Sequence, residues 1–335
     1  MQEGWERAHA HLSLDDATLV ALLAPALPGP GHTLLAAEPL SGGLANTNYK
    51  VTLSGLDEPL VLRVYTRDPD ACERERALYT LVHERVLVPD CLYTGMTSGG
   101  QPYIVSRWIA GEKLDTLLPS LAGEALAGVS HAVGATLARI GAFTFPEWGF
   151  FGPDLTIAEP VRDLRRVTTE YIHEALFSKE ATPRLDPELQ RRVWALVTAN
   201  EALLDTIDGQ ARLVHSDYKA QNLLVRSARD GGEWEVAALD WEFAFAATPL
   251  IDLGILLRYS ARLDPAFERG VIAGYREAGG QLVTDWKRVS RLLDLMNLCG
   301  FLARPNANEP MVAELSGLLR ETVEGWDSYG SERYR

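Results

Sequence analysis

Three side chains between Leu213 and Leu224 combine a proton acceptor with a metal ligand. Asp217 lies two residues after His215, and Asn222 follows it by five, with apolar residues on both sides. The Asp217 carboxylate can accept the proton of an attacking hydroxyl, and the neutral amide oxygen of Asn222 can bind a metal ion that bridges phosphates. The spacing therefore favours phosphoryl transfer, with Asp217 as the base and His215 as an orienting hydrogen-bond residue.

A second carboxylate, Asp240, is expected to bind the metal ion as well. It follows the apolar stretch Trp234–Leu239, which is joined to Asn222–Arg226 by the turn residues Asp230-Gly231-Gly232. This pattern predicts a β-hairpin with the carboxylate at its end. An isolated aspartate at the end of a strand is usually a cap or turn residue. Its position one hairpin after Asn222 instead indicates a Mg²⁺ ligand.

The segments around these residues are expected to be mainly helical. Leu126, Val129 and Val133 share a face typical of a helix, and Asp186-Pro187 is a favourable N-cap and N1 pair. Further helices are predicted at about 160–177, 250–262, 265–278, 285–303 and 309–328, interrupted by short strands at about 212–215, 222–226 and 234–239.

The first third of the chain is expected to be rich in strands. A helix is predicted over residues 14–24, with Ser13 and Asp16 at the spacing of a capping box. We therefore predict an α+β fold with an N-terminal lobe of residues 1–109 and a helical C-terminal lobe of residues 110–335. The predicted strands of the first lobe lie at about 34–40, 48–53, 60–65, 86–93 and 102–108, with a helix at 70–84.

The composition argues against several classes of partner. Of the 335 residues, 47% are hydrophobic and 23% are charged, and the formal net charge is -14 at pH 7. Nucleic acid and anionic membranes are disfavoured because both require basic patches. The N-terminus lacks the pattern of a signal peptide, and the apolar stretch Leu19–Leu27 is too short to span a bilayer. Cys72, Cys91 and Cys299 match no metal-site spacing, so we expect a reduced, cytoplasmic enzyme and leave its oligomeric state open.

The motifs of the C-terminal half resemble those of a known family. His215-Ser216-Asp217 with Asn222, followed by Asp240-Trp241-Glu242, resembles the paired motifs of aminoglycoside phosphotransferases, choline kinases and their relatives. The resemblance extends over roughly residues 35–300 and implies a protein-kinase-like fold with two lobes. It also implies phosphorylation of a small-molecule hydroxyl by ATP, or by GTP, with Mg²⁺ held by Asn222 and Asp240.

The same resemblance assigns nucleotide-binding residues near the N-terminus. Ser41, Gly42, Gly43 and Asn46 lie in a stretch similar to the family's nucleotide loop, between two predicted strands. Arg63 stands at the position of the residue that grips the α- and β-phosphates. Its guanidinium can form bidentate phosphate bonds that a lysine cannot.

A helix and a connecting segment complete the nucleotide site that the resemblance implies. Glu75 is the expected partner of Arg63, with Glu73 as the alternative. The segment after the last predicted strand of the first lobe resembles the family's connection between the lobes. By that analogy the backbone at Arg107 and Ile109 faces the adenine.

Three residues near the catalytic motifs need separate interpretation. Ser216 stands where the family commonly has glycine, which constrains the loop but leaves every functional group in place. Lys219 is included as a candidate catalytic residue that could steady the transferred phosphate, with a solvated loop lysine as the alternative. Asp252 is expected to cap a helix and to support the catalytic loop by hydrogen bonds.

The phosphate acceptor is left open by the sequence. Asp163, Glu170 and Glu174 share one predicted helix face that could bind an ammonium group, although acidic faces are usually only solvated. We expect a small cationic acceptor of the aminoglycoside or choline type, with neutral sugars and amino-acid alcohols as alternatives. An inactive nucleotide-binding scaffold is a further alternative, disfavoured because all three catalytic and metal-binding residues are present. A protein kinase is disfavoured because no activation segment is recognisable.

Overall fold

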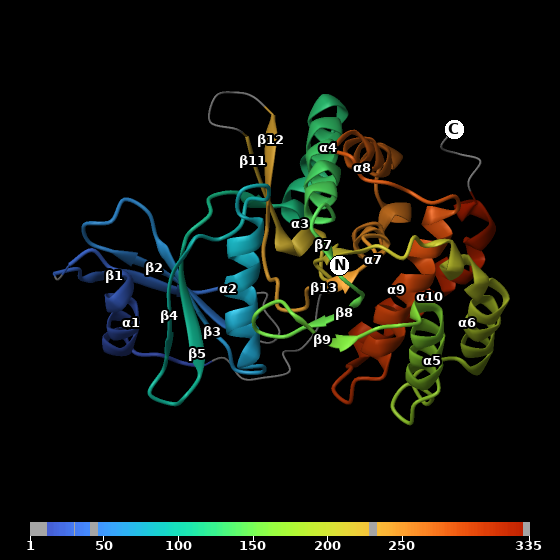
Figure 1. Cartoon of the computed structure of the whole chain (residues 1–335), viewed down its shortest axis with the longest axis horizontal. Coiled ribbons are helices and arrows are strands. Elements are labelled where there is room, and N and C mark those ends of the chain that lie inside the picture. The colour runs from blue at the N-terminus through green and yellow to red at the C-terminus, as the bar shows by residue number, and fades with distance from the viewer. Residues whose placement is uncertain (1–11, 30, 41–45, 228–232, 331–335) are drawn as a thin grey trace.

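The computed structural model describes residues 12–29, 31–40, 46–227 and 233–330. A strand-rich N-terminal part lies beside a larger helical part, and a long β-hairpin rises near their junction (Figure 1). The predicted α+β class is confirmed. The boundary between residues 109 and 110 stays a prediction.

The N-terminal part is built on one antiparallel sheet with the strand order β1-β2-β3-β5-β4. Along β2 and β3 every second side chain is buried, so one face of the sheet forms a core with the helix α1. The helix α2 connects β3 to β4, and it carries Glu75 to the candidate site. The elements are α1 (Asp16–Leu23), β1 (Leu34–Pro39), β2 (Thr47–Leu53), β3 (Leu60–Val64), α2 (Asp70–Val82), β4 (Cys91–Met96) and β5 (Pro102–Arg107).

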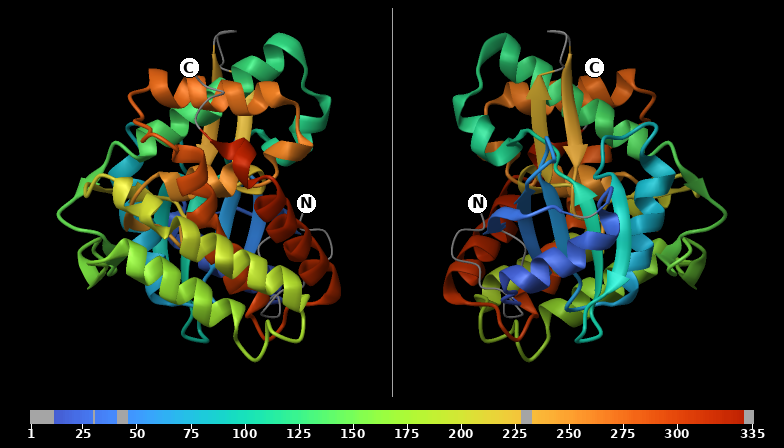
Figure 2. Two further views of the ribbon diagram at one scale, coloured as in Figure 1. Left: turned by 90° about the vertical axis from the view of Figure 1, so that its right-hand side faces the viewer. Right: turned by 90° about the vertical axis from the view of Figure 1, so that its left-hand side faces the viewer.

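The remaining residues form a helical bundle interrupted by two small sheets (Figure 2). One sheet has the order β7-β10-β13-β8-β9, and the other has the order β12-β11-β6. The helices are α3 (Leu114–Leu117), α4 (Gly123–Ile140), α5 (Leu164–Leu176), α6 (Pro187–Asn200), α7 (Leu250–Leu256), α8 (Pro265–Glu277), α9 (Trp286–Leu302) and α10 (Glu309–Glu324). The strands are β6 (Glu112–Lys113), β7 (Thr144–Phe145), β8 (Gly149–Phe151), β9 (Ile157–Pro160), β10 (Ala211–Val214), β11 (Leu223–Ser227), β12 (Trp234–Ala238) and β13 (Phe245–Ala247).

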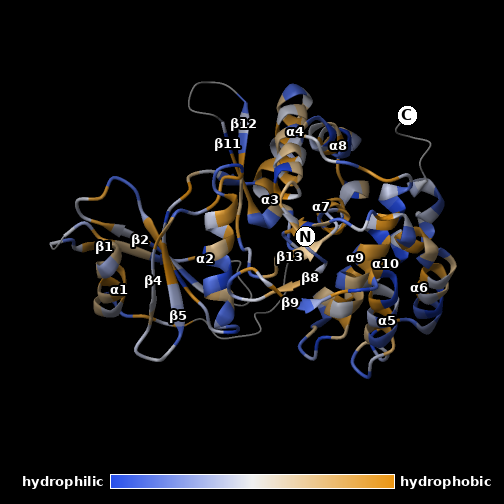
Figure 3. Cartoon of the chain, viewed as in Figure 1, coloured by the Kyte–Doolittle hydropathy of each residue, from blue (hydrophilic) through white to orange (hydrophobic). Residues whose placement is uncertain are grey.

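Hydropathy in Figure 3 follows this arrangement, with apolar residues concentrated where helices face one another. The pair α4 and α8 packs backbone to backbone, because a Cβ atom at Gly134 would lie 1.9 Å from the carbonyl oxygen of Val271 and one at Gly274 would lie 2.0 Å from that of His131. Within the described residues, no helix is long and apolar enough to cross a membrane.

Several predicted elements are shifted in the structure. The strand expected at 86–93 begins only at Cys91, and α5 begins at Leu164 because residues 157–160 form β9. The first helix is capped by Asp15, whose carboxylate accepts a hydrogen bond from Thr18 N at 2.7 Å, and not by Ser13. The strands β6, β7, β8, β9 and β13 were not predicted, since segments of two to four residues carry little periodicity.

Candidate active site

The catalytic loop runs from the end of β10 to the start of β11, and Asp252 holds its first turn. The backbone N–H groups of His215 and Ser216 each donate to one carboxylate oxygen of Asp252, both at 2.8 Å. Asp252 is fully buried and lies inside α7, so it supports the loop as predicted but is not the helix cap. The loop is therefore fixed to α7 by two hydrogen bonds to one buried carboxyl group.

Ser216 adopts the left-handed backbone conformation, with a φ of +64°. Side chains with a Cβ atom rarely adopt this conformation, which glycine adopts at no steric cost. The serine therefore holds a conformation for which glycine would be favoured. This gives a physical reason for the glycine that the family resemblance led us to expect here.

Asp217 is held by two donors that both contact the same carboxylate oxygen. Asn222 Nδ2 donates to Asp217 Oδ2 at 2.7 Å, and Lys219 Nζ lies 3.0 Å from the same atom. A second bond, from Asn222 Nδ2 to Asp217 O at 3.0 Å, closes the loop on itself. Among the described residues, none donates a hydrogen bond to Asp217 Oδ1. The carboxylate is thus oriented with one oxygen available to a substrate.

The environment of Asp217 makes it a better proton acceptor than an ordinary aspartate. Burial raises its pKa, the charge of Asp240 acts in the same direction, and Lys219 and Asn222 oppose the rise. His215 is buried against Trp241, with ring centroids 4.6 Å apart, and its Nδ1 accepts a 3.3 Å hydrogen bond from Asp217 N. Burial lowers the pKa of His215 to about 4, so the ring is neutral at pH 7 and orients the loop.

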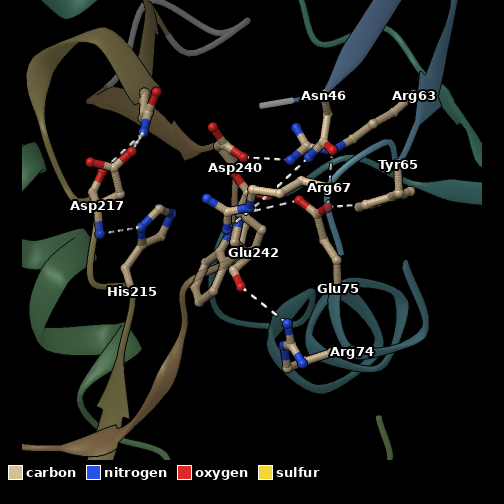
Figure 4. A network of polar contacts seen from close by, with 12 residues as sticks. Asn46, Arg63, Tyr65, Arg67, Arg74, Glu75, His215, Asp217, Asp240 and Glu242 are labelled. Carbon is tan, nitrogen blue, oxygen red and sulfur yellow. Dashed lines mark hydrogen bonds and ion pairs between the residues drawn. The ribbon is translucent and has the colours of Figure 1, made fainter. Parts of the chain in front are cut away.

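Asp240 follows β12 and reaches across to the N-terminal sheet. Arg63, which is on β3, places Nη2 at 2.5 Å from Asp240 Oδ1 (Figure 4). Although burial opposes it, this ion pair lowers the pKa of Asp240. The backbone of Asp240 is also left-handed, with a φ of +67°. Two residues predicted to serve one phosphate centre therefore meet, although 177 positions separate them in the sequence.

Glu75 forms a buried centre that joins Arg63 to the segment after β12. It accepts hydrogen bonds from the hydroxyls of Tyr65 and Tyr79, the latter at 2.7 Å, and from Trp241 N at 3.1 Å. Arg63 Nε lies 3.1 Å from Glu75 Oε2, so the two groups form an ion pair, but Nε does not form a hydrogen bond. Glu73 instead pairs with Arg76 at the surface. Of the two candidates, Glu75 is the partner of Arg63.

Asn46 contacts Glu242, a residue that was not among the predicted site residues. Asn46 Nδ2 donates to Glu242 Oε2 at 2.9 Å, and both side chains are buried. Burial raises the pKa of Glu242 to about 7, and the charge of Asp240 acts in the same direction. The position of Glu242 within the motif Asp240-Trp241-Glu242 was the sequence signal that could have identified it.

The structure gives fewer contacts for the other residues that were predicted to bind the nucleotide. Ser41, Gly42 and Gly43 lie outside the described residues. Arg107 ends β5, its side chain pairs with Asp90 at the surface, and its N–H donates to Asp90 O at 3.0 Å. An adenine contact at Arg107 would therefore have to use its carbonyl group. Ile109 lies two residues further along, in the segment between β5 and β6.

The oxygen donors of the site suit a hard cation that also binds phosphate. Within the described ranges, no group of three or more His, Cys, Asp or Glu side chains could hold a metal ion alone. Mg²⁺ is usually bound by one or two protein oxygens together with substrate phosphates, so such a group is not required. The hydrogen bonds of Asn222 use its Nδ2 and leave the amide oxygen for a cation, and Arg63 uses only one carboxylate oxygen of Asp240.

The acidic residues Asp163, Glu170 and Glu174, which were expected to share one helix face, have different surroundings in the structure. Asp163 caps α5 by accepting a 2.9 Å bond from Arg166 N, and Glu170 pairs with the Arg166 side chain at 2.8 Å. Glu170 and Glu174 also line an open groove of about 320 Å³ between α5 and α6, together with Trp194 and four other residues. Binding of an ammonium group at this face stays a prediction.

The chain is similar to known proteins in both family and fold. The model of a family described as the phosphotransferase enzyme family matches residues 36–292. No curated protein matches the chain. Many solved structures do match it.

Three solved structures illustrate the likeness, each at 18% sequence identity. The GDP complex of wild-type aminoglycoside 2'-phosphotransferase-IIIa has a TM-score of 0.70, over 93% of this chain and 99% of that one. The GDP and kanamycin complex of APH(2")-IIIa gives 0.69, over 90% and 97%. A thermostable mutant of aminoglycoside phosphotransferase APH(4)-Ia, with ADP and hygromycin B, gives 0.66, over 92% and 97%. The predicted two-lobed, protein-kinase-like fold is confirmed.

Proposed function

The chain belongs to the phosphotransferase enzyme family, and on that premise we propose that it transfers the γ-phosphate of ATP to a hydroxyl group of a small molecule, with Asp217 as the base. One observation carries the proposal most strongly. Lys219 and Asn222 both contact Asp217 Oδ2, and no described residue donates a hydrogen bond to Oδ1. A carboxylate oriented in this way has one oxygen for the acceptor hydroxyl.

Each residue around the base has a distinct part in this proposal. Asp217 Oδ1 accepts the proton as the hydroxyl oxygen attacks the phosphorus, and its raised pKa favours that transfer. Lys219 and Asn222 keep the carboxylate from rotating. Lys219 also brings a positive charge beside the reacting groups, where it can stabilise the transferred phosphoryl group.

The nucleotide is proposed to bind beside Arg63 and the metal-binding residues, with its phosphates contacting both. Asn222 and Asp240 would hold Mg²⁺, which neutralises charge on the phosphate oxygens when bound. Arg63 would grip the phosphates, and Glu75 keeps its guanidinium in the cleft by the ion pair at 3.1 Å. Related structures contain ADP in one case and GDP in others, so ATP and GTP are both candidate donors.

The acceptor is proposed to be a small hydroxyl compound that carries amino groups. Kanamycin and hygromycin B, which are bound in two of the related structures, are acceptors of this kind. Neutral sugars and amino-acid alcohols are the alternatives. A thermal-shift screen of aminoglycosides, choline-like amines, amino-acid alcohols and sugars, each with ADP and Mg²⁺, would select among them.

Two matched substitutions test the roles of the carboxylates. Asp217→Asn keeps the shape of the loop but removes the base, so turnover should fall by about 10²–10⁴-fold while Mg²⁺-ATP binding is retained. Asp240→Asn weakens a metal ligand and should reduce both Mg²⁺-ATP affinity and turnover. Calorimetric titration and a phosphate-transfer assay with the acceptor from the screen separate the two effects.

The control is Asp205→Asn, which changes an exposed carboxylate whose one ion pair with a described residue is with Arg165. This variant should match the unsubstituted protein in both assays. If Asp217→Asn kept near-normal turnover, Asp217 would not be the base and the assignment of the loop would be wrong. If the unsubstituted protein bound neither ATP nor GTP with Mg²⁺, the proposed function itself would be rejected.

A further inference from the structure

Glu242 lies where four segments from both parts of the chain meet. Its carboxylate accepts from Asn46 at 2.9 Å and lies 3.9 Å from Arg67 Nη2, and its carbonyl oxygen accepts from Arg74 Nη2 at 3.4 Å. Asn46 directly precedes β2, Arg67 follows β3, and Arg74 belongs to α2. The Glu242 side chain is 4% exposed, so these contacts are made with little water.

Asn46 links Glu242 to the end of β3. Its Nδ2 donates to Glu242, and its Oδ1 accepts from Thr66 N at 3.4 Å, two residues after the strand that carries Arg63. The Asn46 amide therefore donates to the segment that carries Asp240 and accepts from the residues that directly follow β3. In Figure 4, Asn46 lies between the Arg63 strand and the segment that carries Asp240 and Glu242.

The position of this link makes it part of the nucleotide site without contact to the reacting groups. Asp240 must lie at a fixed distance from Arg63 if both are to engage one polyphosphate, because phosphoryl transfer depends on positioning. The Asn46–Glu242 bond spans 196 positions in the sequence and joins these two segments. Both residues are at most 6% exposed, so breaking the bond removes a hydrogen bond between buried polar groups, which water does not readily replace.

We propose that Glu242 is a positioning residue that, through its hydrogen bond with Asn46, holds the Arg63 strand in register with the metal-binding segment. The inference rests on the proposed function, because it assumes that Mg²⁺-nucleotide binds between these segments. It assigns Asn46 to the same link, whereas the sequence led us to expect a direct nucleotide contact from Asn46. The role requires a hydrogen-bond acceptor at position 242 and does not require a negative charge.

The test is a double-substitution cycle read by calorimetric titration with ADP. Asn46→Leu and Glu242→Leu each remove the hydrogen bond between the two buried side chains, and each should weaken Mg²⁺-ADP binding by about 5- to 100-fold. The combined variant should be little worse than either single one, because the two substitutions remove the same bond. Glu242→Gln keeps an acceptor for Asn46 and should bind Mg²⁺-ADP within about 3-fold of the unsubstituted protein.

A second arm separates this role from direct metal binding. If Glu242 positions the strand, the loss in Asn46→Leu and Glu242→Leu should persist when ADP is titrated in EDTA. If Glu242 instead binds Mg²⁺, Glu242→Gln would lose affinity only in the presence of Mg²⁺, and Asn46→Leu would not couple to it. That result, or additive losses in the cycle, would overturn the proposal.

Thermal unfolding of each variant without ligand is measured in parallel. If Glu242→Leu does not fold, Asn46→Leu and Glu242→Gln still decide between the two outcomes. Absence of ADP and ATP binding in the unsubstituted protein would reject the proposed function. Normal binding in the unsubstituted protein with unchanged affinity in Asn46→Leu would reject only the positioning role.

Discussion

Breaking the buried ion pair between Arg258 and Asp294 is expected to destabilise the helical part strongly. Arg258 follows α7, and Asp294 is on α9. Arg258 Nε donates to the two carboxylate oxygens at 3.2 and 3.0 Å, and its Nη2 donates at 2.6 Å. The two side chains are only 4% and 2% exposed. Arg258 also lines a small cavity beside Lys219 and Gln221, so the pair lies behind the catalytic loop.

Asp294→Leu removes the negative partner and leaves the guanidinium buried without a counter-charge. Breaking a buried pair in this way costs about 3–5 kcal/mol. With an unfolding entropy of roughly 2.1 cal/mol/K per residue and 335 residues, each kcal/mol corresponds to about 1.4 °C. The melting temperature measured by scanning calorimetry should therefore fall by about 4–7 °C.

Two further variants make this measurement decisive. Arg258→Met combined with Asp294→Leu removes both charges and should recover most of the loss, since apolar residues of similar volume can replace a buried pair at little cost. Glu170→Gln breaks an exposed pair with Arg166 and should shift the melting temperature by less than about 1 °C. If Asp294→Leu melted within 1 °C of the unsubstituted protein, or if the double variant melted as low as the single one, the reasoning would be wrong.

Arg63→Ala should weaken Mg²⁺-ATP binding and also lower the melting temperature without ligand, because it leaves the fully buried Glu75 without its cation. Calorimetric titration and thermal unfolding measure the two effects, and equal ATP affinity would remove Arg63 from the site. Ser216→Gly should raise the free energy of unfolding by about 1 kcal/mol, because it relieves a left-handed conformation that costs non-glycine residues about 1–2 kcal/mol. Urea unfolding measures this, and a lower midpoint would show that the serine side chain stabilises the loop.

Local signals in the sequence were sufficient to locate the catalytic loop and many element boundaries. The Asp186 cap with its following proline was read correctly, and the Asp186 carboxylate accepts from Glu188 N at 2.9 Å. The hairpin of β11 and β12 was also expected from its strands, although residues 228–232 of its turn lie outside the described part. Caps and strand alternation depend on neighbours within a few positions, so the sequence alone carries them.

The choice of Glu75 over Glu73 needed the tertiary structure. Both glutamates lie in the first half of α2 and have similar chemistry. They are two positions apart, so they point about 160° away from each other on the helix, one into the core and one towards solvent. The packing of α2 against the sheet decides which is buried, and it buries Glu75 against Tyr65, Tyr79 and Trp241 N.

Residue types and short spacings are local properties, so they were enough to identify the residues that have the chemistry for phosphoryl transfer. How these residues meet depends on the tertiary structure. The pairs Arg63–Asp240 and Asn46–Glu242 join residues 177 and 196 positions apart. Such contacts require the closure of a long loop, which has an entropic cost. Packing between many parts of the chain offsets that cost. No spacing within either segment could therefore have indicated them.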